Sequence, residues 1–182
     1  MNELTVINLF AGPGVGKTVL AADLFSVMKK SGAEVEMASE YAKDMVYEQR
    51  TNILKDQLYV LGKQNRRLER LSGQVDFAIC DSPLLLCPVY AATDYYPNSF
   101  KRFALDVFHG YNNINFYLRR SETWQYQAGG RTQKDLEEAR TFDMKILAFL
   151  VDNKIEFQTM QAAEGMVDFN FVRRHILNRD AA

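Results

Sequence analysis

The stretch AGPGVGKTVL, residues 11–20, follows a short apolar segment, LTVINLF, at residues 4–10. That segment is rich in β-branched and apolar residues, which predicts a buried parallel strand. After the glycines, residues 18–30 have the apolar spacing of a helix that stops at Ser31-Gly32. A glycine-rich turn between a buried strand and a helix is typical of a phosphate-binding loop.

The loop is a relaxed form of the pattern G-x-x-x-x-G-K-[ST], because Ala11 stands where the first glycine is expected. We expect its backbone N–H groups to converge on the phosphates of ATP, with Lys17 reaching the β- and γ-phosphates and Thr18 binding Mg²⁺. The expected nucleotide-binding residues are Gly12, Pro13, Gly14, Val15, Gly16, Lys17 and Thr18. The alternative is a glycine-rich turn with no ligand, which the strand–loop–helix context disfavours.

Strand-like and helix-like segments alternate along the rest of the chain. Further strands are expected at 33–38, 75–80, 114–118 and 154–160, and further helices within 40–73 (two) and at 84–93, 99–108, 133–152 and 168–178. This alternation predicts an α/β fold, a P-loop three-layer sandwich with a five-stranded parallel sheet and helices on both faces. We expect residues 1–182 to form a single P-loop domain, with a lid segment at about residues 119–131.

Composition narrows the class of protein. The formal net charge is −1, from 22 Lys and Arg against 23 Asp and Glu, so no overall field attracts nucleic acid or a membrane. Cys80 and Cys87 have neither disulfide nor zinc spacing and are expected to be buried thiols. No signal peptide and no apolar run of about 20 residues is present, which predicts a cytoplasmic protein without membrane contact.

Two acids follow predicted strands, where an open parallel sheet places its ligands. Asp81 ends an apolar strand and is expected to orient Mg²⁺, with a helix N-cap as the alternative role. Glu40 follows the second strand and could accept the proton of a substrate hydroxyl, with helix N-terminal stabilisation as the alternative. Which of the two acids is the general base stays open.

Arginines bracket the expected lid. Arg119, Arg120 and Arg131 could stabilise the charge of a transferring phosphoryl group, or could belong to a solvated basic loop. Trp124 and Tyr126, within the same segment, could stack on a base or anchor the closed lid, and both roles stay open.

Taken in order, the motifs AGPGVGKT, ASEYAKD, QLYVLGKQNRRLERL, ICDSPLLL and YLRRSETWQYQAGGRTQKDLEEAR resemble small bacteriophage P-loop kinases. Among these, the chain resembles the 5-hydroxymethyluracil DNA kinases, which are related to thymidylate and nucleoside kinases. The resemblance implies transfer of the γ-phosphoryl of MgATP to the base hydroxymethyl group within DNA, a step of thymidine hypermodification. It also implies catalytic roles for Lys17, Glu40, Asp81, Arg120 and Arg131.

The sequence departs from thymidylate kinases at Asp81-Ser82-Pro83, where those enzymes carry an Asp-Arg pair that holds a substrate phosphate. Its absence suits an acceptor without a 5′-phosphate in that pocket. The alternatives are a kinase of free nucleosides or nucleotides and an ATPase coupled to a partner. The expected partners are therefore DNA containing 5-hydroxymethyluracil or a free nucleoside or nucleotide, with the protein a monomer or a homodimer.

Overall fold

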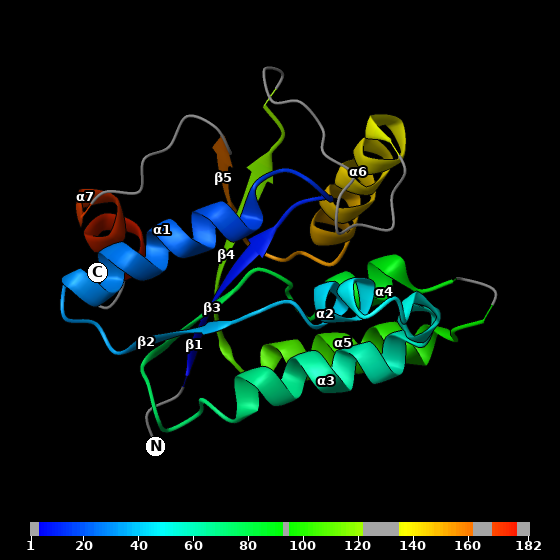
Figure 1. Ribbon diagram of the computed structural model, residues 1–182, viewed down its shortest axis with the longest axis horizontal. Helices are drawn as coiled ribbons and strands as arrows, with labels where there is room; N and C mark the ends of the chain where they lie inside the picture. The colour runs from blue at the N-terminus through cyan, green and yellow to red at the C-terminus, as the bar shows by residue number, and fades with distance from the viewer. Residues whose placement is uncertain (1–3, 93–94, 122–134, 162–168, 178–182) are drawn as a thin grey trace.

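The computed structural model describes residues 4–92, 95–121, 135–161 and 169–177 (Figure 1). Its centre is a five-stranded sheet in the order β2-β3-β1-β4-β5, in which every pair of neighbouring strands is parallel. The strands are β1 (Thr5–Phe10), β2 (Val35–Ala38), β3 (Phe77–Cys80), β4 (Asn112–Arg119) and β5 (Gln158–Gln161). The predicted α/β fold with a parallel five-stranded sheet is confirmed.

The first strand shows why the sheet must be covered on both faces. Successive side chains of a strand point to opposite faces, so Ile7 and Leu9 enter one apolar core while Val6 and Phe10 enter two others. All four side chains are at most 1% exposed. A strand that is buried on both faces reads as the continuous apolar run seen in the sequence.

The helices divide between the two faces (Figure 1). Helix α1 (Lys17–Lys30) and the C-terminal α7 (Phe169–Val172), which continues as a π-helix (Arg173–Leu177), cover one face. The other face is covered by α2 (Tyr41–Tyr47), a 3₁₀ turn (Thr51–Lys55), α3 (Gln57–Glu69), α4 (Leu86–Tyr90), α5 (Asn98–His109) and α6 (Leu136–Asp152). The sandwich therefore has the three layers that the alternating pattern predicts.

The last strand begins later than predicted. The segment 154–160 was expected to be extended from its first residue, but Lys154 has a φ of 55°, in the left-handed region, and belongs to the turn after α6. Its N–H donates to Val151 O and the N–H of Ile155 donates to Leu150 O, so these residues finish the helix. Periodicity could not show this, because Ile155 is a buried apolar residue that suits a strand as well as the turn after the helix.

All five strands run in the same direction, so their carboxyl ends meet at one edge of the sheet. The connections that leave this edge include residues 11–16, Ser39 with Glu40, residues 81–85 and Arg120 with Ser121. These are the positions at which ligands bind open α/β sheets. Within the described ranges, no helix is both long and apolar enough to cross a bilayer.

Candidate functional site

The loop between β1 and α1 has the backbone shape of an anion cradle. Gly14 and Gly16 have φ angles of 75° and 106°, a left-handed conformation that side chains rarely adopt. Gly16 is the N-cap residue of α1 and offers no side chain to satisfy the first N–H groups of the helix. Those donors and the positive end of the helix therefore face the loop, where a phosphate would bind.

Lys17 lies across the first half of this loop. Its Nζ donates hydrogen bonds to the carbonyl oxygens of Ala11 (2.8 Å) and Gly12 (3.0 Å). Burial lowers the pKa of Lys17 below the ordinary value of 10.5, whereas the nearby carboxylates of Glu40, Asp81 and Asp143 raise it. The ammonium is thus held over the loop by contacts that a phosphate could replace.

Thr18 and Asp81 form a pair beside Lys17. The Thr18 hydroxyl donates to Asp81 Oδ2 (3.0 Å), and the Asp81 side chain is only 4% exposed. The other oxygen, Asp81 Oδ1, is buried with no hydrogen-bond partner among the described residues. A buried carboxylate oxygen left open next to a hydroxyl fits Mg²⁺, which takes a few protein oxygens and completes its shell with phosphates and water.

The alternative role of Asp81 as a helix N-cap is wrong. Helix α4 begins at Leu86, and its N-cap residue is Leu85. Asp81 therefore stands four positions ahead of the cap, at the end of β3, with its carboxylate turned to Thr18.

Glu40 is the N-cap residue of α2, and within the described residues its side chain makes no capping hydrogen bond to that helix. Its neighbours on both sides are fixed by α3. Gln64 Oε1 accepts from the N–H of Tyr41 (3.1 Å), and Gln64 Nε2 donates to Ser39 O (3.3 Å). Because Gln64 is only 2% exposed, this link is shielded from water and fixes the backbone that carries Glu40.

Arg67 adds a second link from α3 to the same turn. Its guanidinium donates to Ser39 O (3.0 Å) and to the Ser39 hydroxyl (2.5 Å), and it forms an ion pair with Asp44. In the structure this arginine is paired and positions the residue before Glu40.

Arg120 lies directly after β4, beneath the phosphate loop. Its Nε donates to Asp143 Oδ2 (2.8 Å), and its Nη2 donates to Asp143 Oδ1 (3.1 Å) and to Pro13 O (2.8 Å). Asp143 Oδ1 also accepts the N–H of Gly12 at 2.9 Å. The two side chains are 12% and 16% exposed, so this ion pair is largely withdrawn from water.

Asp143 was not predicted as a site residue. It belongs to α6, whose buried apolar residues are Ala139, Ile146 and Leu150. Asp143 falls in the same row of the helix, four positions after Ala139 and three before Ile146. The sequence could have indicated Asp143, because an acid within an apolar row of a helix is expected to be buried, and a buried carboxylate needs a partner.

The remaining residues of the expected lid are only partly described. Arg119 is the last residue of β4 and is exposed. Trp124, Tyr126 and Arg131 lie outside the described residues. The structure thus brings together Lys17, Thr18, Glu40, Asp81 and Arg120 and adds Asp143. The role of Arg131 stays a prediction.

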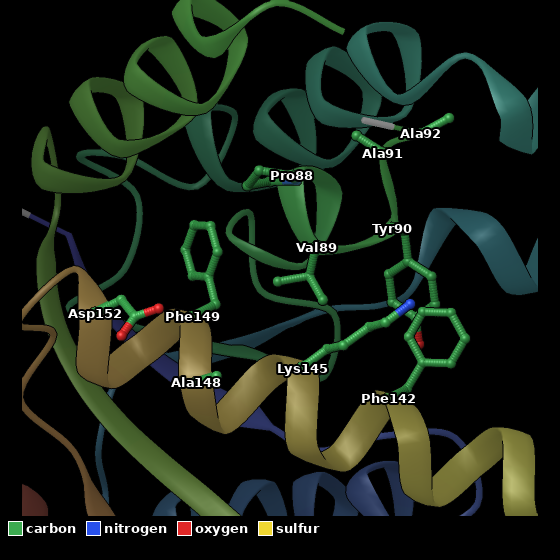
Figure 2. Close-up of a pocket in the computed structure, with 10 residues that line it drawn as sticks. All are labelled: Pro88, Val89, Tyr90, Ala91, Ala92, Phe142, Lys145, Ala148, Phe149 and Asp152. Carbon is green, nitrogen blue, oxygen red and sulfur yellow. The ribbon is translucent and has the colours of Figure 1, made fainter. Parts of the chain in front are cut away.

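A cavity of about 570 Å³ lies between α4 and α6 (Figure 2). Tyr90 and Phe142 stack at one end, with ring centroids 4.5 Å apart. Lys145 places its Nζ 5.1 Å from the centre of the Phe142 ring, and Figure 2 shows its side chain reaching toward these rings. The lining contains no predicted site residue, so this cavity is separate from the phosphate loop.

The fold is similar to solved structures of nucleotide-binding proteins. One is NadR protein in complex with NAD and AMP-PNP, with a TM-score of 0.67, 12% identity and coverage of 94% of this chain. The chain spans about half (49%) of the length of that NadR chain. Another is deoxyadenosine kinase from M. mycoides with bound dATP, with a TM-score of 0.52, 18% identity and coverage of 97% of this chain and 100% of that one.

The same deoxyadenosine kinase, with the products dCMP and dCDP bound, gives a TM-score of 0.54, 19% identity and coverage of 97% of this chain and 98% of that one. At such identities the likeness establishes the P-loop kinase-like α/β fold. No curated protein matches the sequence significantly. The family model for the AAA domain matches residues 6–165, most of the chain, and the protein therefore belongs to the AAA domain family.

Proposed function

We propose that this protein is a phosphotransferase that moves the γ-phosphoryl group of MgATP to a hydroxyl of a nucleoside-type acceptor. The observation that carries the proposal is the position of Glu40 relative to Lys17. Glu40 follows β2 and Lys17 follows the loop after β1, so both lie at the carboxyl edge of the parallel sheet. Burial lowers the pKa of Lys17, and the Glu40 carboxylate raises it. A carboxylate therefore lies close to where Lys17 would hold the β- and γ-phosphates.

Each residue has a role in the proposed reaction. The loop and the first turn of α1 bind the phosphates, and Lys17 exchanges its contacts with Ala11 and Gly12 for phosphate oxygens. Thr18 and Asp81 Oδ1 would hold Mg²⁺, which neutralises charge on the phosphates when it is bound. Glu40 accepts the proton of the attacking hydroxyl.

Arg120 belongs to the proposal as a cation beside the loop, and Arg131 as a cation from the expected lid. The two roles differ in support. Arg120 is in contact with the loop backbone at Pro13 O, whereas the role of Arg131 rests on the sequence alone. Arg131 would offset the charge of the transferring phosphoryl group, whereas Arg120 would support the loop that holds the nucleotide.

The acceptor has two candidates. The sequence resemblance favours 5-hydroxymethyluracil in DNA, whose base hydroxymethyl group is a primary alcohol, and such a base must leave the duplex stack to reach a pocket. The likeness to deoxyadenosine kinase favours a free deoxynucleoside instead. The near-neutral net charge of −1 gives no general attraction to DNA, so a DNA acceptor would be recognised locally.

The experiment uses ATP labelled at the γ-phosphate. The acceptors are single- and double-stranded DNA with 5-hydroxymethyluracil, the same DNA with thymine, free 5-hydroxymethyldeoxyuridine, deoxyadenosine and thymidine, and no acceptor. Label in the modified DNA supports the first acceptor, and label in a nucleoside monophosphate supports the second. Label released as inorganic phosphate at the same rate without any acceptor would show an ATPase and overturn the kinase proposal.

The variant Glu40→Gln tests the role of Glu40 as general base separately from nucleotide binding. We expect kcat to fall by about 10²–10⁴-fold, the usual contribution of a general base, while MgATP affinity changes little. Glu34→Gln is the matched control, because Glu34 is exposed on the approach to β2. Equal activity of the Glu40→Gln variant and the parent would exclude Glu40 as the base and favour Asp81.

A further inference from the structure

We propose that Asp143 and Arg120 form a positioning pair, here named the Asp143–Arg120 clamp, that holds the first half of the phosphate loop in its nucleotide-binding shape. The proposal rests on the proposed function to the extent that the loop must bind MgATP. It assigns a role to Asp143, and it has Arg120 act through Asp143 and the loop backbone rather than by touching the transferred phosphoryl group.

The clamp satisfies backbone groups that nothing regular can satisfy. Between the end of β1 and the start of α1, Gly12 N–H donates to Asp143 Oδ1 and Pro13 O accepts from Arg120 Nη2. Pro13 has no N–H of its own. The carbonyls of Ala11 and Gly12 accept from Lys17, so when phosphates draw Lys17 away, the two clamp contacts still hold this half of the loop.

Steric fit shows how close α6 comes to the loop. A Cβ atom on Gly12 would lie 2.2 Å from Asp143 Oδ1 and 3.0 Å from the backbone carbonyl of Ala139. Gly12 is not among the glycines with a positive φ angle, so its conformation does not require glycine. Glycine is required at this position because the Asp143 carboxylate occupies the space of a side chain.

The charges of the clamp explain why two residues are needed. Asp143 alone would place a carboxylate beside a loop that binds phosphate, and its charge reaches Lys17. Arg120 neutralises that carboxylate through paired contacts from Nε and Nη2, the fork geometry that lysine cannot reproduce. Removing Arg120 alone therefore leaves an unpaired anion next to the phosphates, whereas removing both charges does not.

A double-mutant cycle on MgATP affinity tests the clamp. The proteins are the parent, Asp143→Asn, Arg120→Gln and the double variant, with Kd measured by calorimetry without acceptor. We expect each single variant to bind MgATP about tenfold more weakly and the double variant to bind no more weakly than the worse single variant. If Asp143→Asn left affinity unchanged or tighter, or if the loss from Arg120→Gln were the same in both backgrounds, the clamp would be wrong.

Turnover gives a second readout. At saturating MgATP the Asp143→Asn variant should keep kcat within about threefold of the parent, because a high MgATP concentration compensates for weaker binding to the loop. A selective fall in kcat for Arg120→Gln, with unchanged affinity, would instead show direct contact with the transferring group and overturn the proposal. Arg120→Lys keeps the charge but loses the fork, so we expect intermediate affinity.

Matched controls lie on the same helix. Arg140 and Asp152 belong to α6 and are exposed, so Arg140→Gln and Asp152→Asn make the same chemical changes away from the loop. Both should bind MgATP like the parent. Equal losses in these controls and in the clamp variants would show that any charge change on or near α6 has this effect, and would overturn the specific role.

Gly12→Ala provides a test that needs no nucleotide. The added methyl group should displace the carboxylate in the parent and lower Tm, but it should cost less in an Asp143→Ala background, where the carboxylate is gone and the backbone carbonyl of Ala139, at 3.0 Å, remains. Amide hydrogen exchange at Gly12 should be slow in the parent and faster in Asp143→Ala. Equal Tm losses in the two backgrounds, with unchanged exchange, would contradict the contact.

The failures of the two proposals are distinguishable. If the parent binds MgATP but labels no hydroxyl acceptor, the kinase proposal fails while the cycle still tests the clamp. If the parent labels an acceptor but the cycle is additive, the clamp fails and the kinase proposal stands. If the parent binds no MgATP, both are wrong.

Discussion

The hydroxyl of Thr18 donates a hydrogen bond to Asp81 Oδ2 over 3.0 Å, which joins the first residues of α1 to the end of β3. The two residues are far apart in the sequence, and they meet because β1 and β3 are parallel neighbours whose carboxyl ends lie at the same edge of the sheet. The same carboxylate keeps its second oxygen buried and without a hydrogen-bond partner in the described part of the chain. Among the described residues, the Asp81 carboxylate is the strongest indication of a metal site, because one of its two oxygens has no hydrogen-bond partner.

Asp81→Asn should therefore separate metal-dependent from metal-independent nucleotide binding. We expect ATP affinity in the presence of Mg²⁺ to fall by about 10- to 100-fold, the scale of losses seen when a metal's binding groups are altered. Affinity in EDTA should be unchanged or slightly higher, because a negative charge is removed near the phosphates. Calorimetry with and without Mg²⁺ measures both, and an equal loss in EDTA would assign Asp81 to loop structure instead.

Nucleotide binding should be linked to proton uptake by Lys17. Burial lowers its pKa below 10.5 in the free protein, and bound phosphates should raise it again. Between the lowered and the raised pKa, the free protein has lost a proton that the complex holds, so binding takes up protons in that window. Below the window Lys17 is charged in both states and contributes no uptake.

The uptake is measured by calorimetry in two buffers of different ionisation enthalpy, from neutral pH to pH about 10. At alkaline pH the phosphates do not contribute, since the second pKa of a phosphate monoester is about 6. Lys29→Gln is the control, because Lys29 is a half-exposed lysine of the same helix. Proton release at alkaline pH would contradict the assignment.

The two cysteines should be unreactive in the folded protein. Cys80 and Cys87 are free and buried, and burial raises the pKa of each thiol to about 12. At pH 8 we expect a thiol reagent to modify them only as fast as the protein opens, and to modify both at once in urea. Rapid labelling of one thiol in native buffer would show that its surroundings open locally.

Leu24 should hold the helix that follows the phosphate loop. It is 0% exposed and packs in the core between α1 and the sheet. Leu24→Ala should lower the free energy of unfolding by about 3 kcal/mol through lost burial and the cavity left behind. Val19→Ala, on the same helix with Val19 56% exposed, should change it by at most about 0.5 kcal/mol. Urea unfolding of both variants measures the difference, and equal losses would show that α1 is not anchored through Leu24.

Local patterns in the sequence predicted the secondary structure well where a single feature, such as an apolar run or a group of glycines, decides it. β1 and β3 are short apolar runs, and the turn at residues 11–16 contains glycines that bend the chain regardless of its partners. The start of β5 was missed because Lys154 adopts a left-handed conformation that its side chain does not announce. Such a turn is set by how α6 ends and not by residue type.

Part of the candidate site could also be predicted from local patterns in the sequence. Lys17, Thr18, Glu40 and Asp81 each follow or enter an element at the carboxyl edge, so the rule for parallel sheets placed them together. Asp143 follows no strand, and its role depends on α6 lying against the loop. Gln64 and Arg67 likewise reach Ser39 from another helix, a contact that no spacing within α3 indicates.

The sequence by itself determined that a phosphate cradle follows the first strand and that parallel strands bring acids to it, because these follow from backbone freedom, apolar runs and chain direction. The tertiary structure decided what holds the cradle. Arg120 was expected on a lid, but it lies under the loop and is paired with Asp143. That pairing exists because two charges largely withdrawn from water must meet, and only the packing of α6 on β1 and β4 brings them within reach.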